Sequence, residues 1–304
     1  TEIYTLSLHD ALPISPVPMV MWGGKKTINL PADGGSSNLC AKCHQPRPMT
    51  CNNDPAARLL NYDSLVIAPT IVMYDSTAGA KNIYVRPAYR MHVHYGTAAA
   101  VVAGTGAVEF PGSRTYSNSP HTEAASCADC HMAHPMNGIA GGHSFNVRNA
   151  KESALTNSTT FNFNGCNQEG CHNANPIDAN HSKWKDVRAE VKTLLEALAA
   201  KINAAGSGND ILHKDASTSN LWAGITANNY DGYLDIYDAS ANPDGYWRNP
   251  YNTSAANMAK PKFPSLLNVH LGAIINFQFC LREYSLGIHN TPYVKALLTN
   301  TVEA

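Results

Sequence analysis

Three short stretches of one kind constrain this chain more than any other feature. In each stretch two cysteines are followed by a histidine that comes directly after the second cysteine. The stretches are residues 40–44 (CAKCH), 127–131 (CADCH) and 166–172 (CNQEGCH). This is the attachment pattern of a c-type haem, in which two cysteine sulfurs bond the porphyrin and the histidine binds the iron. The third stretch has four residues between its cysteines where two are usual, which is a rarer variant.

The motifs predict how three haems c are held. The cysteines predicted to form the covalent bonds are Cys40, Cys43, Cys127, Cys130, Cys166 and Cys171. The predicted proximal iron ligands are His44, His131 and His172. The alternative is zinc, because two cysteine pairs could make a four-cysteine site. Zinc explains the cysteines but gives no role to three well-placed histidines, in a chain with only 13 histidines among 304 residues.

Each six-coordinate iron needs a second axial ligand, which we expect from histidines outside the motifs. The candidates are His94, His121, His143 and His289. His94 stands two residues before a glycine that leaves room for a porphyrin edge, and His143 follows two glycines that allow close approach to a ring. His289 lies between two predicted helices, flanked by Gly287 and Pro292.

His121 precedes Cys127 by six residues. At that offset it cannot easily reach back over the haem that follows it, so we expect it to bind a neighbouring haem. His92, His181 and His270 are weaker ligand candidates. For the two methionines near the second motif, Met132 and Met136, we expect packing roles, although methionine is an alternative axial ligand. A calcium site among Asp231, Asp235 and Asp238 is disfavoured, because their spacing does not match the EF-hand pattern.

The predicted fold is mainly α with much irregular structure, and with haems forming the core. Gly, Pro, Asn and Ser are frequent through the first 180 residues, so a core made of peptide alone would be thin. Apolar, β-branched runs at residues 65–75 and 82–85 predict a small β-hairpin. Helical spacing predicts long C-terminal helices at residues 183–204, with Ser182 as N-cap, 264–286 and 292–302.

The chain divides into three regions. Residues 1–15 read like a translated sequencing-adapter oligonucleotide, so we expect them to be non-native and the true N-terminus, with any export signal, to be missing. Residues 16–180 are the predicted haem-binding region, and residues 181–304 the helical C-terminal region that supplies a distal ligand. Two cysteines lie outside the motifs, Cys51 and Cys280, and either a disulfide or free buried thiols would account for them.

Charge and hydropathy exclude two classes of partner. The chain has 22 basic and 23 acidic residues, and nothing in this balance suggests a nucleic-acid partner. No run approaches the roughly 18 apolar residues of a membrane span. The best stretch, residues 266–279, is interrupted by Asn268, His270, Asn276 and Gln278.

The motifs, the histidine ahead of the second motif, the GGHSF stretch at 141–145 and the GIHNTPY stretch at 287–293 together resemble multihaem c-type cytochromes. The broad relatives include ammonia-forming nitrite reductases, hydroxylamine-oxidising enzymes and electron carriers of respiratory chains. The resemblance implies a periplasmic or extracellular location and other redox proteins as partners, and leaves an oligomer open. The lysine-containing motif of the nitrite reductases is missing here. Four distal candidates for three haems suggest a further haem, in a missing segment or in a partner.

The leading functional hypothesis is electron transfer through mostly bis-histidine haems, since iron with both axial sites filled changes oxidation state without binding substrate. The alternative is a haem enzyme converting a small nitrogen or sulfur compound at one open iron. In that case the groups expected to line the pocket are Arg86, Arg90, His92 and Tyr95. We favour the electron carrier, so no catalytic residue is predicted.

Overall fold

The structure is a computed structural model, and it describes residues 15–47, 60–75, 93, 96–149, 160–215, 222–235 and 265–304. The helices are α2 (Asn38–Cys43), α3 (Tyr62–Ile67), α4 (Ala98–Val102), α5 (His121–Ala124), α6 (Cys127–His131), α7 (Ser182–Ala204), α8 (Asn268–Leu281) and α9 (Thr291–Glu303), with short 3-10 turns η1 (Val20–Trp22) and η3 (Gly142–Ser144). The strands are β1 (Val17–Pro18), β2 (Thr27–Ile28), β3 (Val72–Asp75), β4 (Leu212–Lys214), β5 (Tyr230–Leu234) and β6 (Ser265–Leu267). They form three antiparallel pairs, β1–β2, β3–β6 and β4–β5.

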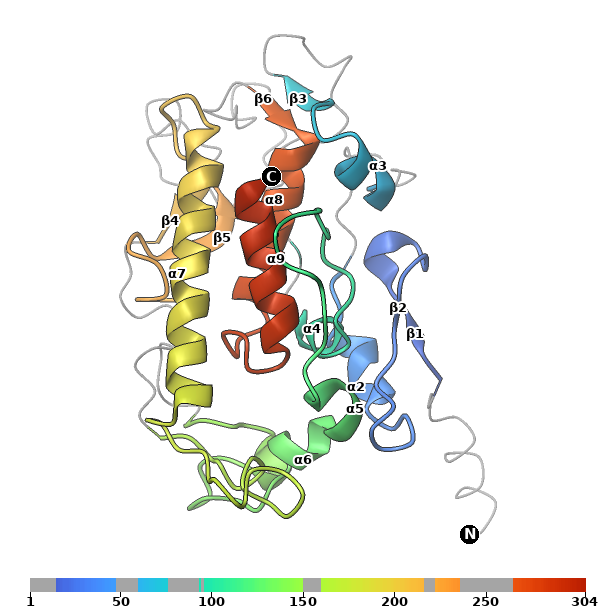
Figure 1. The fold of residues 1–304 in the computed structure, drawn as a ribbon, viewed down its shortest axis with the longest axis vertical. Coiled ribbons are helices and arrows are strands. Elements are labelled where there is room, and N and C mark those ends of the chain that lie inside the picture. The colour runs from blue at the N-terminus through green and yellow to red at the C-terminus, as the bar shows by residue number, and fades with distance from the viewer. Residues whose placement is uncertain are drawn as a thin grey trace, which may run out of the picture.

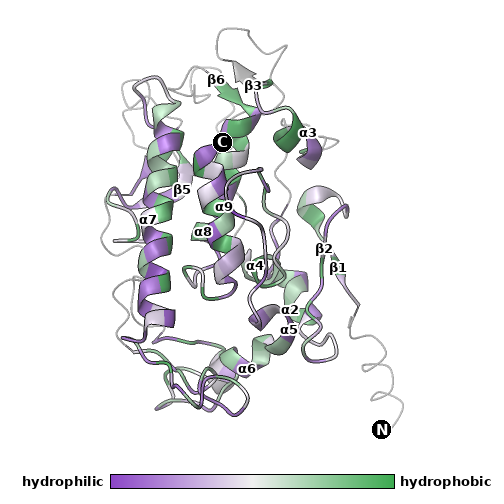
Figure 2. Cartoon of the chain, viewed as in Figure 1, coloured by the Kyte–Doolittle hydropathy of each residue, from purple (hydrophilic) through white to green (hydrophobic). Residues whose placement is uncertain are grey.

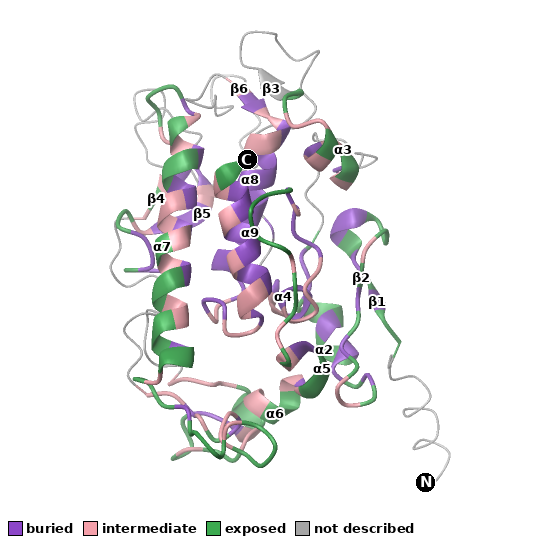
Figure 3. Cartoon of the chain, in the orientation of Figure 1, coloured by how far each residue is buried: buried purple, intermediate pink, exposed green. Residues whose placement is uncertain are grey.

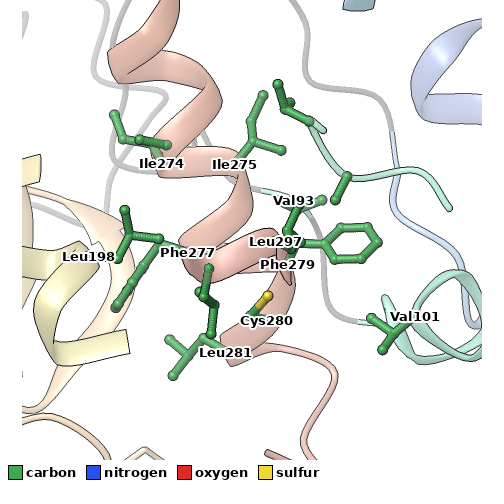
Figure 4. Close-up of a cluster of buried hydrophobic side chains, with 14 of the residues drawn as sticks. Val93, Val101, Leu198, Ile274, Ile275, Phe277, Phe279, Cys280, Leu281 and Leu297 are labelled. Atoms are coloured by element: carbon green, nitrogen blue, oxygen red, sulfur yellow. The ribbon is translucent and has the colours of Figure 1, made fainter. Parts of the chain in front are cut away.

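Helices α7, α8 and α9 pack against one another and form the body of the molecule (Figure 1). Helix α8 lies at the centre, because every residue from Leu271 to Leu281 is buried (Figure 3). Helix α7 is amphipathic, with polar residues along its outer side and an apolar side toward the other two helices (Figure 2). The core at α8 therefore consists of polypeptide side chains, with residues of α7 and α9 completing the cluster (Figure 4).

Buried amides on α8 fasten loops to this core. The Asn276 side chain accepts a hydrogen bond from the Val108 N–H (2.8 Å) and donates one to the Val108 carbonyl (2.7 Å). The Gln278 side chain accepts from the Val93 N–H and donates to the Gly232 carbonyl. Because the interior offers no water, each such bond fixes the position of a distant segment.

The two outer predictions for the C-terminal helices are confirmed. Residues 183–204 lie in α7, and residues 292–302 lie in α9, with Pro292 in its first turn as helices prefer. The N-cap of α7 differs from the prediction. It is His181, whose Nδ1 accepts the Lys183 N–H at 3.2 Å, while Ser182 is already helical.

The helix predicted at residues 264–286 is shorter in the structure. Residues 265–267 form strand β6, and α8 ends at Leu281. The next residues cannot continue a helix, because Tyr284 and Leu286 have positive φ angles of 64° and 56°. They form a tight loop that leads to His289.

The hairpin predicted at residues 65–85 is wrong in its first half. Residues 62–67 are the helix α3, capped by Asn61, and only residues 72–75 form a strand. That strand, β3, pairs with β6, with Val72 opposite Leu267. Residues 82–85 lie outside the described residues. The partner of β3 is thus a segment far away in sequence, which the local β-branched pattern did not indicate.

Cys280 is a free thiol buried in the last turn of α8, where burial raises its pKa well above the ordinary value. Of the two alternatives for the cysteines outside the motifs, a disulfide or free buried thiols, the structure has a free thiol at Cys280. Cys51 lies outside the described residues.

Candidate haem-binding site

The first two motifs lie on short helices. The first occupies the end of α2, and the second is the whole of α6. Helix α6 begins with a capping box in which the Ser126 side chain accepts the Asp129 N–H and the Asp129 side chain accepts the Ser126 N–H. On one helical turn, cysteines three residues apart lie on the same face. Each pair of thiols therefore faces one side of its helix, as attachment to one porphyrin requires.

The third motif lies in a turn-rich loop. The longer spacer folds back so that the His172 N–H donates to the Cys166 carbonyl at 3.0 Å. The side chain of Asn167 holds the loop by bonding both the N–H and the carbonyl of Ile177. The four-residue spacer thus forms a turn that the hydrogen bond from the His172 N–H closes, and it brings the backbone of His172 next to that of Cys166.

The three motifs lie next to one another at one end of the molecule. The Cys127 N–H donates to Ser37 Oγ at 3.0 Å, which joins the second motif to the turn before α2. Gly165 packs on the second motif so closely that a Cβ there would lie 2.5 Å from the Asp129 carbonyl oxygen. Figure 1 places α2, α5 and α6 next to one another in the lower part of the molecule.

Burial raises the pKa values of the motif thiols. It raises the pKa of Cys127 to about 11 and, with the neighbouring Cys166 thiol, that of Cys130 to about 12. Within the described ranges, no group of three or more histidine, cysteine, aspartate or glutamate side chains has the arrangement of a metal site.

The structure brings the proximal histidine of the second motif to a predicted distal histidine. The ring centroids of His131 and His289 are 6.3 Å apart, and the ring planes are 25° from parallel. A metal–imidazole bond of about 2.0–2.1 Å places two imidazoles on opposite sides of one metal ion with centroids about 6–6.5 Å apart. The pair therefore has the separation that ligation of one iron requires.

A second pair of predicted ligands has the same separation. The rings of His121 and His172 have centroids 6.3 Å apart and planes at 89°. Rotation about a metal–nitrogen bond changes the angle between the planes and leaves the separation unchanged. His121 thus lies at the third motif and not at the second motif that follows it in sequence. That it binds a neighbouring haem stays a prediction.

Hydrogen bonds to Nδ1 leave Nε2 available in three of these four rings. The partner atoms are the Phe145 carbonyl oxygen for His131 (2.8 Å), the Ile288 carbonyl oxygen for His121 (3.2 Å) and Glu283 Oε2 for His289 (2.7 Å). A ring that donates its Nδ1 proton to an oxygen keeps a lone pair on Nε2, which is the tautomer that binds a metal. Burial also lowers the pKa of His131 and of His172, which favours the neutral ring. The donor set therefore fits a haem iron.

The first motif has no such pair within the residues the structure describes. His44 is exposed, and its carbonyl accepts the Ala99 N–H at 3.1 Å. Gly96 lies against this motif, because a Cβ there would lie 3.2 Å from the Cys43 carbonyl oxygen. The predicted partner, His94, lies outside the described residues, as does His92. Its role as the ligand for this haem stays a prediction.

His143 is not brought to another histidine in the described part of the chain. It lies exposed on η3, near the second motif. The neighbouring Phe145 contributes instead, through the carbonyl that accepts from His131. The prediction that His143 is an axial ligand is therefore neither confirmed nor replaced by this arrangement.

Two of the weaker candidates, His181 and His270, accept hydrogen bonds from the backbone. The Nδ1 atoms of His181 and His270 accept backbone N–H groups, from Lys183 and Leu267 respectively, so the proton of each neutral ring is on Nε2. This is the wrong tautomer for binding iron through Nε2. Asp231 bonds His213 at 2.9 Å, which gives that carboxylate a use other than calcium.

The sequence analysis missed the groups that orient the ligands. Two are backbone carbonyls, which no sequence pattern identifies. The third, Glu283, had a recognisable signal in a carboxylate six residues before a predicted ligand, with a glycine between them.

Comparisons with protein-family models, with curated proteins and with solved structures find no match for this chain. The functional argument therefore depends on the motifs and on the geometry described above.

None of the helices in the described ranges is both long enough and apolar enough to cross a lipid bilayer.

Proposed function

We propose that this chain is an electron-transfer protein that holds three c-type haems covalently, at least two of them between paired histidines. The single observation that carries the proposal is the pairing of two motif histidines with histidines from distant segments at 6.3 Å. Two independent pairs have the separation of axial ligands, and Nδ1 is bonded to oxygen in three of the four rings, which supports ligation through Nε2.

The residues have separate tasks in this proposal. The six motif cysteines form thioether bonds, Cys40 and Cys43 in the first motif, Cys127 and Cys130 in the second, Cys166 and Cys171 in the third. His131 with His289, and His172 with His121, supply both axial nitrogens at the second and third motifs. His44 is the proximal ligand at the first, with His94 as its proposed partner. When bound, each haem supplies a one-electron couple, whose potential the axial ligands and the surrounding polarity set.

Filled axial positions favour an electron carrier over an enzyme. The hydrogen bond from the Cys127 N–H to Ser37 Oγ and the close packing of Gly165 on the second motif support attachment sites that are close together, which suits transfer from one haem to the next. We propose redox proteins as partners and a periplasmic or extracellular location, in line with the resemblance to multihaem cytochromes.

The visible spectrum of the chain matured with haem tests the proposal. Residues 16–304 are produced in an exporting host that attaches haem c, and the oxidised and reduced spectra are recorded with and without cyanide or nitrite. We expect low-spin spectra that neither anion changes. A high-spin component that shifts with nitrite would support the haem-enzyme alternative, and a colourless protein would contradict both.

A further inference from the structure

Glu283 is a carboxylate enclosed entirely within the protein. It is buried, and it lies in the loop between α8 and α9. Its Oε2 accepts hydrogen bonds from His289 Nδ1 (2.7 Å) and from Ser285 Oγ (2.5 Å), and its Oε1 accepts the Gly287 N–H (2.8 Å). Three donors thus face the two oxygens of this buried side chain, an arrangement that favours a carboxylate over a neutral acid. The carboxylate is therefore ionised.

The loop around Glu283 is held in an uncommon backbone conformation. Tyr284, Leu286 and Gly287 all have positive φ angles, of 64°, 56° and 89°. Two of these three residues carry side chains that disfavour this region, so their conformation costs free energy that the surrounding contacts must offset. The turn brings His289 back onto Glu283, and Ser285 Oγ also accepts the His289 N–H at 3.0 Å. Such strain is expected where a side chain must be held at a defined position.

Glu283 distinguishes one histidine pair from the other. His131 and His121 donate to neutral carbonyl oxygens, whereas His289 donates to a buried charge. A carboxylate partner makes an imidazole a stronger electron donor than a carbonyl does. A stronger donor stabilises the oxidised, more positive iron more than the reduced iron, and the low-polarity surroundings strengthen the effect of the charge. Arg188, within electrostatic reach of Glu283, offsets part of it.

We infer that Glu283 is a positioning residue that acts through His289 to lower the reduction potential of the haem at the second motif. The inference rests on the proposed function, because it requires His289 to be an axial ligand.

Potentiometric titration of the holoprotein, followed by visible absorbance, tests this role with two variants of opposite expected sign. Glu283→Gln removes the charge. We expect the reduction potential of one haem to rise by at least about 59 mV, which corresponds to a tenfold change in the equilibrium constant of a one-electron couple. Ser285→Ala keeps the charge but removes a competing donor from Oε2, so we expect the same potential to fall. If the substitutions merely loosened the loop, the reduction potential would shift in the same direction in both variants.

Asp231→Asn is the matched control, because it removes a second carboxylate that bonds a histidine, His213, and that is also buried. Its haem potentials should equal those of the wild type. If Glu283→Gln does not fold, the test depends on Ser285→Ala alone. An unchanged or raised potential of the second haem in that variant overturns the inference. Unchanged potentials in Glu283→Gln also overturn it. The wild-type protein distinguishes failure of this inference from failure of the proposed function. A wild-type protein that carries no haem would contradict the proposed function, whereas unchanged potentials in a haem-bearing protein contradict only the role of Glu283.

Discussion

His131 and His289 come from distant parts of the chain, yet their ring centroids are 6.3 Å apart and each Nδ1 is bonded to an oxygen. One ring belongs to an attachment motif on α6 and the other to the loop before α9. The relationship joins the loop before α9 to the second motif. Under the proposed function, the helical body is thus a part of the site and not merely a support for it.

Replacement of His289 by alanine should open the iron at the second motif. We expect a high-spin component amounting to about one haem in three, and cyanide binding that the wild type lacks. His134→Ala is the control, since His134 is an exposed histidine close to the same motif, and its spectrum should stay low-spin. A wholly low-spin His289→Ala protein would show that another residue binds this iron.

Replacement of His121 by alanine should affect the third motif and leave the second unchanged. The ring of His121 lies at His172, although the residue is only six positions before Cys127. Electron paramagnetic resonance of the oxidised protein can separate the two pairs, because ligand planes at 25° and at 89° give different low-spin signals. We expect the signal of the perpendicular pair to disappear. Loss of the near-parallel signal instead would contradict the pairing.

The sequence names the residues of the candidate site but not how they combine. The motifs, His121 and His289 are recognisable because attachment chemistry and flanking residues mark them locally. Which distal histidine meets which motif depends on the packing of α8, α9 and the loop between them. That packing is a long-range property, and no local spacing contains it.

The same contrast applies to the fold. Helices α7 and α9 follow from apolar periodicity and from Pro292. The β3–β6 pair and the early end of α8 do not, because each depends on contacts between distant segments. Asn268 illustrates this, since its side chain donates to the carbonyls of Ser64 and Ala68.

Asn276→Ala should destabilise the helical body. The substitution leaves the buried Val108 N–H without its acceptor and removes a donor from Thr301 Oγ1. An unsatisfied buried group costs about 1–3 kcal/mol, so we expect the free energy of unfolding to fall by about 2–3 kcal/mol. Urea denaturation of the holoprotein measures this. Asn180→Ala, at an exposed position, should change the free energy by less than about 0.5 kcal/mol. Equal stabilities for the two variants would contradict the role of Asn276.

Stability should decrease in alkaline solution because of tyrosines near Glu109. Burial, followed by the charge of Glu109, raises the pKa of Tyr62 and Tyr293 far above the ordinary 10.0, and burial raises that of Tyr116 to about 12. The unfolded chain loses these protons near pH 10, whereas the folded chain keeps them. The stabilisation is therefore complete below about pH 10 and is lost as the pH rises through the folded values.

Urea denaturation between about pH 9 and about pH 11 checks this sign. The free energy of unfolding should fall across the interval, and Tyr116→Phe should reduce the slope because it removes one of the ionising groups. A profile that is flat, or that rises with pH, would contradict the assignment of buried neutral tyrosines.

The central claim is that three haems are covalently attached through the paired cysteines, and the mass of the intact, denatured protein tests it most directly. Denaturation removes any haem that is merely bound, but thioether-linked haem remains on the chain. We predict a mass above that of the polypeptide by three haem groups, falling to two when Cys166 and Cys171 are replaced by serine. A denatured wild-type protein with the mass of its polypeptide alone would contradict the account.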